Sequence, residues 1–225
     1  MDAAVELDGV SVRFGARRVL DGISLRVARG ARLGVIGPAA GGKSVLLKVI
    51  ARLVAPDAGR VAVCGAVGML FQNSALFDFL DVYDNVAFPL VQAGLPAKQI
   101  DQKVSARLRA VGLAGAERKL PSELSGGMRK RAGLARATVA SPDVVLYDEP
   151  TAGLDPVTTS KVYELLRAER STAIVVSSDV EAVARFCDTI AFLDGGGIRW
   201  SGAADRLFDA DDAHVRRFAR GELVA

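Results

Sequence analysis

Apolar residues along the chain form short continuous runs that alternate with segments of helical spacing. "RLGVIG" (32–37), "DVVLYDEP" (143–150) and "STAIVVSS" (171–178) contain such runs, which are typical of strands buried on both faces of a sheet. "KSVLLKVIARLV" (43–54) and "TTSKVYELLRAER" (158–170) instead repeat apolar residues at helical spacing. Strands that alternate with helices predict a mainly parallel sheet covered by helices on both faces.

The remaining segments predict how this sheet is extended and interrupted. "VELDGVSVRF" and "GISLRV" are β-rich, and "DAGRVAVCGAVGMLFQ" predicts two strands joined by a tight hairpin near Gly65 and Ala66. From Asn73 to about Ala140 the pattern is helical, which predicts an insertion between two strands. "TIAFLDGGGIRWSG" predicts a second hairpin, and short helices close the chain. We therefore expect an α/β fold with a single domain over 1–225 and a helical subdomain over about 73–140.

Composition narrows the class of protein. The chain has 225 residues, of which 50% are hydrophobic and 24% charged, and this suits one α/β domain with a large core. A net charge of +3 suits anionic partners without singling out nucleic acid or a membrane surface. Cys64 and Cys187 lack metal-ligand spacing, which favours a reducing compartment. The N-terminus does not resemble a signal peptide, and no apolar run approaches the roughly 18–20 residues that span a bilayer.

"GPAAGGKS" (37–44) fits the phosphate-binding pattern G-x-x-x-x-G-K-[ST] between a predicted strand and a predicted helix. Its glycines let backbone N–H groups turn toward phosphates, and the helix N-terminus adds partial positive charge. A glycine-rich turn that fits by chance is the alternative, which the flanking strand and helix disfavour. Lys43 suits the β- and γ-phosphates, and the Ser44 hydroxyl suits Mg²⁺. The predicted phosphate-binding residues are Gly37, Pro38, Ala39, Ala40, Gly41, Gly42, Lys43, Ser44 and Val45.

Two acidic residues follow the apolar run "VVLY". The strand would deliver Asp148 and Glu149 to the C-terminal edge of the sheet, where open α/β sheets bind ligands. Asp148 would then hold Mg²⁺, directly or through water, and Glu149 would polarise the attacking water as general base. Taken alone, two acids at a strand end are as typical of a solvated turn or a helix N-cap. The phosphate-binding motif of residues 37–44, called the P-loop from here on, favours the catalytic interpretation.

A third motif, "LSGGMRKRAGLARA" (124–137), places a serine and two glycines before a basic helical run. The start of such a helix suits an anion, and the alternative is an ordinary capped helix with a basic solvated face. The basic residues also raise the question of nucleic acid, but no aromatic residues lie among them, so we expect no nucleic-acid partner. These residues are Arg129, Lys130, Arg131 and Arg136.

Taken together, these motifs resemble those of the ATPase subunits of ABC transporters. The P-loop, Gln72 at the end of "GMLFQ", "LSGGM", "LYDEP" and "AGLD" follow the order of that family. The resemblance implies two ATP molecules in a head-to-tail dimer, each between one subunit's P-loop and Ser125, Gly126 and Gly127 of the other. It also implies that Gln72 reaches Mg²⁺ and its water, and that Asp155 acts across the dimer interface.

A narrower resemblance concerns the segment "LFQNSALFDFLDVYDNVAFPL", Met128 and "HVRRFARGE". These are similar to the ATPases of Mla-type and mammalian-cell-entry-associated systems, which move phospholipids or other lipids within the bacterial envelope. The resemblance implies an integral membrane permease, a second ATPase subunit and a lipid-binding substrate protein as partners. It also implies a peripheral location on the cytoplasmic face of the inner membrane. A regulatory ATP-binding module, an exporter of another apolar compound, and a soluble ABC protein of ribosomes or DNA repair are the alternatives.

The same segment would border the groove that receives a coupling helix of the permease. Its apolar residues suit that groove and the core of a helical subdomain equally. They are Leu76, Phe77, Phe79 and Leu80. Phe14 occupies the position where an aromatic of the family stacks on adenine, and an ordinary core aromatic is the alternative there.

Two features depart from the family pattern. The chain lacks a segment of a dozen or more residues that relatives carry between "GRVAVCG" and "GMLFQ". Ser178 occupies the position of a histidine that contacts the γ-phosphate in the family. A serine hydroxyl is shorter and uncharged, so we expect slower hydrolysis by the isolated subunit, with ATP binding less affected because Lys43, Ser44 and the backbone amides are present.

Overall fold

The computed structural model describes residues 2–222. Its strands are β1 (Ala3–Phe14), β2 (Arg17–Ala28), β3 (Arg32–Ile36), β4 (Ala58–Val63), β5 (Val67–Leu70), β6 (Val144–Asp148), β7 (Thr172–Val176), β8 (Thr189–Asp194) and β9 (Gly197–Ala203). Its α-helices are α1 (Lys43–Ile50), α2 (Val82–Gln92), α3 (Ala97–Ala110), α4 (Gly126–Thr138), α5 (Pro156–Ala168), α6 (Val180–Phe186) and α7 (Ala213–Ala219). Short 3₁₀ segments cover Pro121–Glu123 and Ala204–Asp209.

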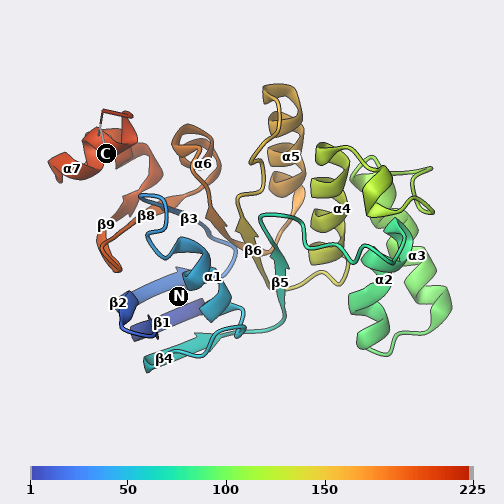
Figure 1. Ribbon diagram of the computed structural model, residues 1–225, viewed down its shortest axis with the longest axis horizontal. Helices are drawn as coiled ribbons and strands as arrows, with labels where there is room; N and C mark the ends of the chain where they lie inside the picture. Colours follow the sequence, from blue (N-terminus) through green and yellow to red (C-terminus); the bar gives the residue numbers. More distant parts are fainter. Residues whose placement is uncertain (1, 223–225) are drawn as a thin grey trace.

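Within residues 2–222 these strands form two sheets (Figure 1). The smaller sheet has the order β2–β1–β4 and is antiparallel. The larger has the order β5–β6–β7–β3–β8–β9 and is parallel except for β9, which returns beside β8 as the predicted hairpin. The fold is therefore the α/β fold that the sequence predicts, with a mainly parallel core sheet and a small antiparallel sheet.

Strand β6, which lies between β5 and β7, is buried along its whole length. Successive side chains of a strand point to opposite faces of the sheet. Val144 and Leu146 accordingly pack in a core shared with α1 and the small sheet, whereas Val145 and Tyr147 pack in the core beneath α5 and α6. Burial on both faces explains why the strand is an uninterrupted apolar run.

Parallel pairing brings the C-terminal ends of three strands to one edge of the larger sheet. β3 pairs with β7, and β7 pairs with β6, where Asp148 lies opposite Val176. The P-loop follows β3, Glu149 follows β6, and Ser177 follows β7. The topology therefore places these segments side by side, at the edge where such sheets bind ligands.

The helices α2, α3 and α4 lie between β5 and β6 in the sequence and to the right of the sheets in Figure 1. They share a hydrophobic cluster of their own, which includes Val86, Leu108 and Ala132. The first of these helices begins at Val82, nine residues after the predicted helical pattern begins at Asn73. Left-handed φ angles at Ser74 and Ala75, +59° and +47°, are incompatible with a helix at that point.

The predicted hairpin near Gly65 and Ala66 is wrong. Gly65 does turn the chain, with a φ of +87°, but β4 then joins the small sheet and β5 joins the larger one. Asp143 stabilises the crossing, because its Oδ2 accepts a hydrogen bond from the Ala66 N–H at 2.8 Å. The shortened segment is thus a link between two sheets.

None of the helices in residues 2–222 has the length and apolar character needed to cross a membrane.

Candidate nucleotide-binding site

A pocket of about 420 Å³ opens at the edge where β3, β6 and β7 end. The P-loop forms one wall, from Ala39 to the start of α1. Gln72 and Glu149 line the pocket from the two neighbouring strand ends, and Phe14 lines it from the end of β1. Phe14 is 53% exposed, so it is not a core aromatic. The structure therefore brings together residues from four separate sequence motifs.

Lys43 lies within the P-loop itself. Its Nζ donates hydrogen bonds to the carbonyl oxygens of Gly37 and Pro38, at 2.8 and 2.7 Å. Burial lowers the pKa of this ammonium, while the nearby carboxylates of Glu149 and Asp148 act in the opposite direction. A phosphate group in the pocket would compensate this partly desolvated charge.

Close packing explains the glycine that begins the P-loop. A Cβ on Gly37 would lie 2.0 Å from the carbonyl oxygen of Leu193 in β8. The φ of Gly37 is +146°, which an L-residue rarely adopts. Both features explain why a residue without a Cβ stands at this position, from which the loop leads into α1, whose first residues line the pocket.

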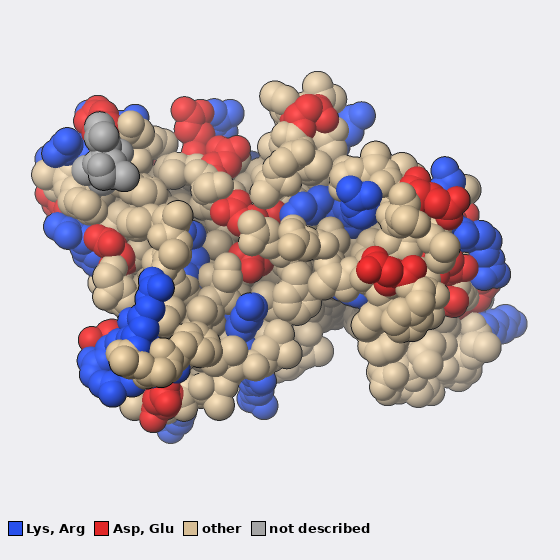
Figure 2. Space-filling model, in the orientation of Figure 1, with Lys and Arg blue, Asp and Glu red and all other residues tan. Residues whose placement is uncertain are grey.

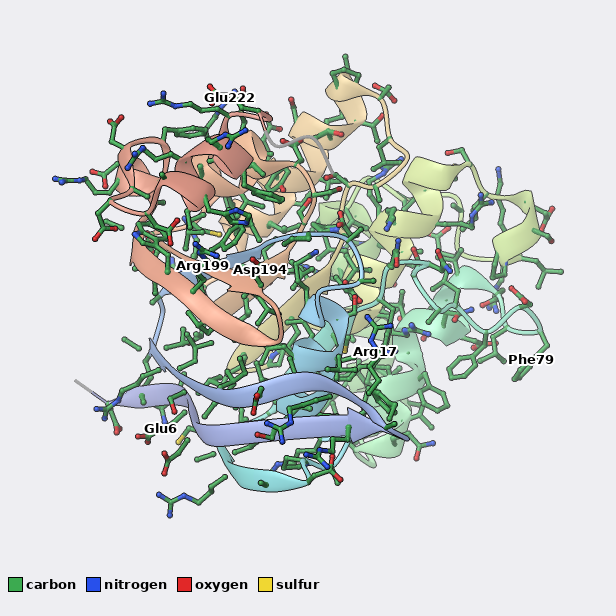
Figure 3. The ribbon with its side chains drawn as sticks, turned by 60° about the vertical axis from the view of Figure 1, so that its left-hand side comes forward. Glu6, Arg17, Phe79, Asp194, Arg199 and Glu222 are labelled. Atoms are coloured by element: carbon green, nitrogen blue, oxygen red, sulfur yellow. The ribbon has the colours of Figure 1, made fainter. Side chains whose placement is uncertain are left out.

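Sequence motifs did not indicate three further residues of the pocket: Arg17, Val19 and Val176. Arg17 lies beside the start of α1 (Figure 3), and its Nη2 donates to the carbonyl of Ala40 at 3.4 Å. Ala40 has a φ of +56°, which is unfavourable for a residue with a Cβ. Two consecutive arginines after "RFGA" could have drawn attention to Arg17, because a P-loop pocket attracts cations to bound phosphates.

Two oxygen donors suited to Mg²⁺ lie next to each other beneath the P-loop. The Ser44 hydroxyl donates to Asp148 Oδ1 at 3.0 Å. Burial raises the pKa of Asp148, and the hydrogen bond from Ser44 partly offsets this effect. Mg²⁺ prefers such hard oxygen ligands and takes only one or two carboxylates, with phosphate and water completing its shell. The residues present therefore fit a magnesium ion bound together with a nucleotide.

Glu149 is held in an unusual backbone conformation. Its φ is +47°, in the left-handed region where residues other than glycine are strained. Its N–H donates to the Val176 carbonyl at 2.8 Å. Its carboxylate Oε2 accepts hydrogen bonds from Ser177 Oγ at 3.1 Å and from Ser178 Oγ at 3.3 Å. The conformation directs the carboxylate across the end of β7 and into the pocket.

Ser178, the residue in place of the family histidine, thus lies beside Glu149. Ser177 makes the shorter of the two hydroxyl contacts and is 2% exposed. It also accepts a hydrogen bond from the Asp179 N–H at 3.1 Å, which fixes the strand end. The sequence motifs singled out Ser178 alone, because Ser177 has no counterpart among the catalytic residues that the resemblance implies.

The remaining predicted residues form a second group outside the pocket. Ser125 caps α4 and accepts a hydrogen bond from the Met128 N–H at 3.3 Å. A Cβ on Gly127 would lie 2.9 Å from Thr158 Cγ2, so the start of α4 packs against the first turn of α5. Asp155 caps that turn, and hydrogen bonds from Thr158 lower the pKa of its carboxyl. Gly126, which lies between Ser125 and Gly127, is exposed.

The basic residues of α4 turn toward main-chain carbonyl oxygens of the protein itself. Arg129 donates to Leu124, Arg131 to Val111 and Gly112, and Arg136 to Ser74 and Ala75. Lys130 is buried and donates to the carbonyls of Gln72 and Glu149. These contacts connect α4 with the segments that follow α3, β5 and β6.

Comparison with known proteins finds a family profile, curated relatives and solved structures that all belong to ATP-binding proteins of the same kind. The ABC transporter family profile matches residues 20–152. The chain is 38% identical to "Protein TRIGALACTOSYLDIACYLGLYCEROL 3, chloroplastic" of Arabidopsis thaliana, over 99% of this chain and 75% of that protein. It is 39% identical to the intermembrane phospholipid transport system ATP-binding protein MlaF of Escherichia coli, over 96% and 88%. A dimeric post-hydrolysis state of an ATP-binding cassette bound to ADP and Pi has a similar fold, with a TM-score of 0.82, 25% identity, and coverage of 89% and 98%.

Proposed function

The chain belongs to the ABC transporter family as an ATP-binding subunit with ATPase activity, and we propose that its ATP hydrolysis energises a membrane permease that moves phospholipid or another lipid. The observation that carries the catalytic part is one pocket lined by Lys43, Ser44 and Glu149, in which Ser44 is hydrogen-bonded to Asp148. The lipid part is supported by the phospholipid transport named for the MlaF relative, which this chain matches over nearly its whole length.

We propose that the P-loop residues bind the phosphates of ATP. Backbone N–H groups of the loop and the first turn of α1 would donate to phosphate oxygens. Lys43 would exchange its present carbonyl acceptors for the β- and γ-phosphates, which are stronger acceptors because they are charged. Phe14 is exposed at the pocket, where it would stack on the adenine base.

Ser44, Asp148 and Gln72 are the proposed magnesium-binding residues. When bound, Mg²⁺ neutralises charge on the β- and γ-phosphates. Glu149 would accept a proton from the attacking water as general base, and Gln72 would help to orient that water. The two serine hydroxyls hold the Glu149 carboxylate in place for this step.

The second group of residues supports a dimer. ABC ATPases dimerise, and the ATP-binding cassette that resembles this chain is dimeric. We propose a head-to-tail homodimer in which Ser125, Gly126 and Gly127 of one subunit complete the nucleotide site of the other. Ser125, Gly126 and Asp155 are exposed, as such a contact requires. The Ser125 hydroxyl and the free N–H groups at the start of α4 would face the γ-phosphate.

The proposed permease contact is an apolar groove of about 510 Å³ between the end of α1, β5 and α2. Leu53, Val67 and Phe88 line it and are 59%, 37% and 38% exposed. A coupling helix of the permease fits this surface, because an amphipathic helix buries its apolar face in such a groove. In this arrangement residues 73–140 act as a helical subdomain within a single domain, and the chain lies on the cytoplasmic face of the inner membrane. A lipid-binding substrate protein would complete the system.

Substitution of Glu149 tests the catalytic part. Glu149→Gln should lower ATP turnover at least about 100-fold, because the amide cannot act as a base. Its affinity for ATP should stay close to that of the unsubstituted protein, and light scattering should detect an ATP-dependent dimer. Unchanged turnover would mean that Glu149 is not the base and would remove the basis of the proposal.

Copurification from membranes tests the transport part. The tagged protein should retain a polytopic membrane protein, and mass spectrometry should identify phospholipid or another lipid in the complex. Recovery of ribosomes or of DNA repair proteins instead would contradict the transport role. A complex whose ATP turnover rises with a different apolar compound, and not with lipid, would leave the ATPase assignment intact and overturn the cargo.

A further inference from the structure

Lys130 carries a buried positive charge on α4. The residue is 7% exposed, and its Nζ donates to the carbonyl oxygens of Gln72 and of Glu149, the latter at 2.7 Å. An ammonium group is expensive to bury without hydrogen-bond partners. Lys130 therefore needs both carbonyls, and its contact with the Glu149 carbonyl is shorter than the 3.3 Å contact that the Ala152 N–H makes with the same oxygen.

Both acceptors belong to residues of the nucleotide pocket. Glu149 is the more sensitive of the two, because its backbone is left-handed, with a φ of +47°. Val176 accepts the Glu149 N–H at 2.8 Å, and Lys130 binds the Glu149 carbonyl. Main-chain hydrogen bonds at both ends of this residue thus stabilise an otherwise unfavourable conformation.

The side-chain geometry of Glu149 depends on that conformation. Its Oε2 meets the hydroxyls of Ser177 and Ser178 because the backbone turns across the end of β7. A relaxed backbone at Glu149 would redirect the carboxylate away from the pocket. General-base catalysis is sensitive to such a change, since small misplacements of a reacting group lower rates steeply.

The other basic residues of α4 provide a contrast. Arg131 makes the same kind of contact, from Nη1 to the carbonyls of Val111 and Gly112 at 2.9 and 2.8 Å. Its acceptors follow α3 and do not line the nucleotide pocket. Lys130 thus differs from Arg131 in where its hydrogen bonds lead, although both join α4 to a neighbouring segment.

We propose that Lys130 is a positioning residue for ATP hydrolysis, which holds the main chains of Gln72 and Glu149 so that their side chains face the nucleotide. It acts from the helix that Ser125 caps, so the start of α4 and the base are joined through one side chain. The proposal rests on the general-base role proposed above for Glu149.

Kinetics of Lys130→Met give the first test. Turnover should fall about 10- to 100-fold, while the KM for ATP and the affinity for a fluorescent ATP analogue in EDTA change less than about threefold. Lys130→Arg, which keeps a charged donor, should recover most of the turnover. Arg131→Met is the matched control and should leave turnover within about twofold, even where both variants lower the melting temperature equally. Equal kcat losses in the two methionine variants would overturn the proposal.

Hydrogen exchange gives a readout that does not depend on activity. In Lys130→Met, amides of the peptide that spans Asp148 to Ala152 should exchange at least about tenfold faster, and in Arg131→Met they should be unchanged. Unchanged exchange in Lys130→Met would overturn the proposal. Lys130→Gln, which keeps an N–H donor without the charge, replaces the methionine variant in both assays if that variant is insoluble.

A double substitution separates this proposal from the proposed function. In single-turnover assays, Lys130→Met should lower the rate less than about threefold further in a Glu149→Gln background, because the side chain that it positions is already inactive. Full additivity of the two losses would contradict the positioning role and leave the general base in place. Turnover that does not respond to Glu149→Gln would instead overturn the proposed function, and the role of Lys130 with it.

Discussion

The Glu149 carboxylate and the Ser178 hydroxyl lie 3.3 Å apart, at the place where the family resemblance implies a histidine. The hydroxyl donates to this carboxylate, and Ser178 does not line the pocket. An imidazole is longer and can carry charge, so it can contact a terminal phosphate and the base together. Loss of one well-placed transition-state contact lowers rates about 10²–10³-fold. We therefore expect slow hydrolysis by the isolated subunit.

Replacement of this residue should restore the missing contact. Ser178→His should raise the turnover of the isolated subunit about tenfold or more, with a smaller effect on ATP affinity, because the P-loop contacts are unchanged. Steady-state ATPase assays with purified protein measure both quantities. Ser178→Ala is the control and should change turnover less than about threefold, since Ser177 still holds the carboxylate. Equal turnover of the histidine variant and the unsubstituted protein would contradict the hypothesis.

The two cysteines lie in contrasting surroundings. Cys187 is buried, and burial raises the pKa of its thiol to about 12. Cys64 is exposed, and Arg29 Nη2 lies 2.8 Å from its sulfur. Because the thiolate is the reactive form, a disulfide reagent should label one thiol in the native protein and two after denaturation. Cys64→Ser should abolish native labelling, and comparable rates at both cysteines would contradict this prediction.

At the residue scale, the sequence indicates which residues lie close together where contiguous motifs supply them. Lys43, Ser44, Asp148 and Glu149 are predicted from such motifs, and the structure brings all four together. The contacts of Lys130 could not be predicted in this way, because their acceptors lie 58 and 19 residues away in the sequence. A lysine in a basic helical run is typical of a solvated face, and the local pattern does not indicate its burial.

At the scale of elements, local pattern predicted the existence of strands better than their pairing. β4 and β5 are both present, but they belong to different sheets. A glycine turn between two short strands is equally compatible with a hairpin and with a crossing, so hydrogen bonds from distant segments decide the outcome. Here those segments are β1, which pairs with β4, and β6, which pairs with β5.

An ion pair connects α3 with the end of α5. Arg107 on α3 and Glu169 after α5 lie 2.5 Å apart, and each side chain is 17% exposed. Arg107 also donates to Thr138 Oγ1 on α4. Tyr147 lies close enough for both charges to influence its hydroxyl, and burial raises the pKa of this tyrosine. The pair therefore joins three elements in largely desolvated surroundings.

Removal of one partner should destabilise the protein. Arg107→Met should lower the free energy of unfolding by about 2–4 kcal/mol, because it leaves the Glu169 carboxylate largely buried without its cation. This corresponds to a fall of about 5–10 °C in melting temperature for a chain of this size, measurable by calorimetry. Arg185→Met is the matched control, since Arg185 and Glu181 are also 2.5 Å apart but 75% and 69% exposed. Its effect should stay within about 0.5 kcal/mol, and equal losses in both variants would contradict this account.

At the scale of the whole molecule, the sheets and the helices α2–α4 flank an apolar surface. Figure 2 shows the outline indented between the sheet-containing part on the left and the helices on the right, with few charged side chains beside the indentation. Phe77 and Phe88 pack with ring centroids 4.8 Å apart and line the groove, whereas Phe79 is 80% exposed and projects outward (Figure 3). The sequence left open whether the apolar residues from 76 to 80 border a groove or belong to a helical core, and the structure shows that different residues of this segment do each. Leu76 packs against the helical cluster, and Phe79 is free to contact a partner.

A charge in this groove should uncouple the subunit from its permease without stopping ATP hydrolysis. Leu53 is 59% exposed, so Leu53→Asp removes little from the core but places a carboxylate where an apolar helix face would dock. Copurification of the membrane partner should fall at least about tenfold, while ATP turnover of the isolated subunit stays within about twofold. Leu120→Asp is the control, because Leu120 is 41% exposed and does not line the groove. Undiminished copurification of Leu53→Asp would exclude this groove as the docking site, and equal losses in both variants would point to a general effect of added charge.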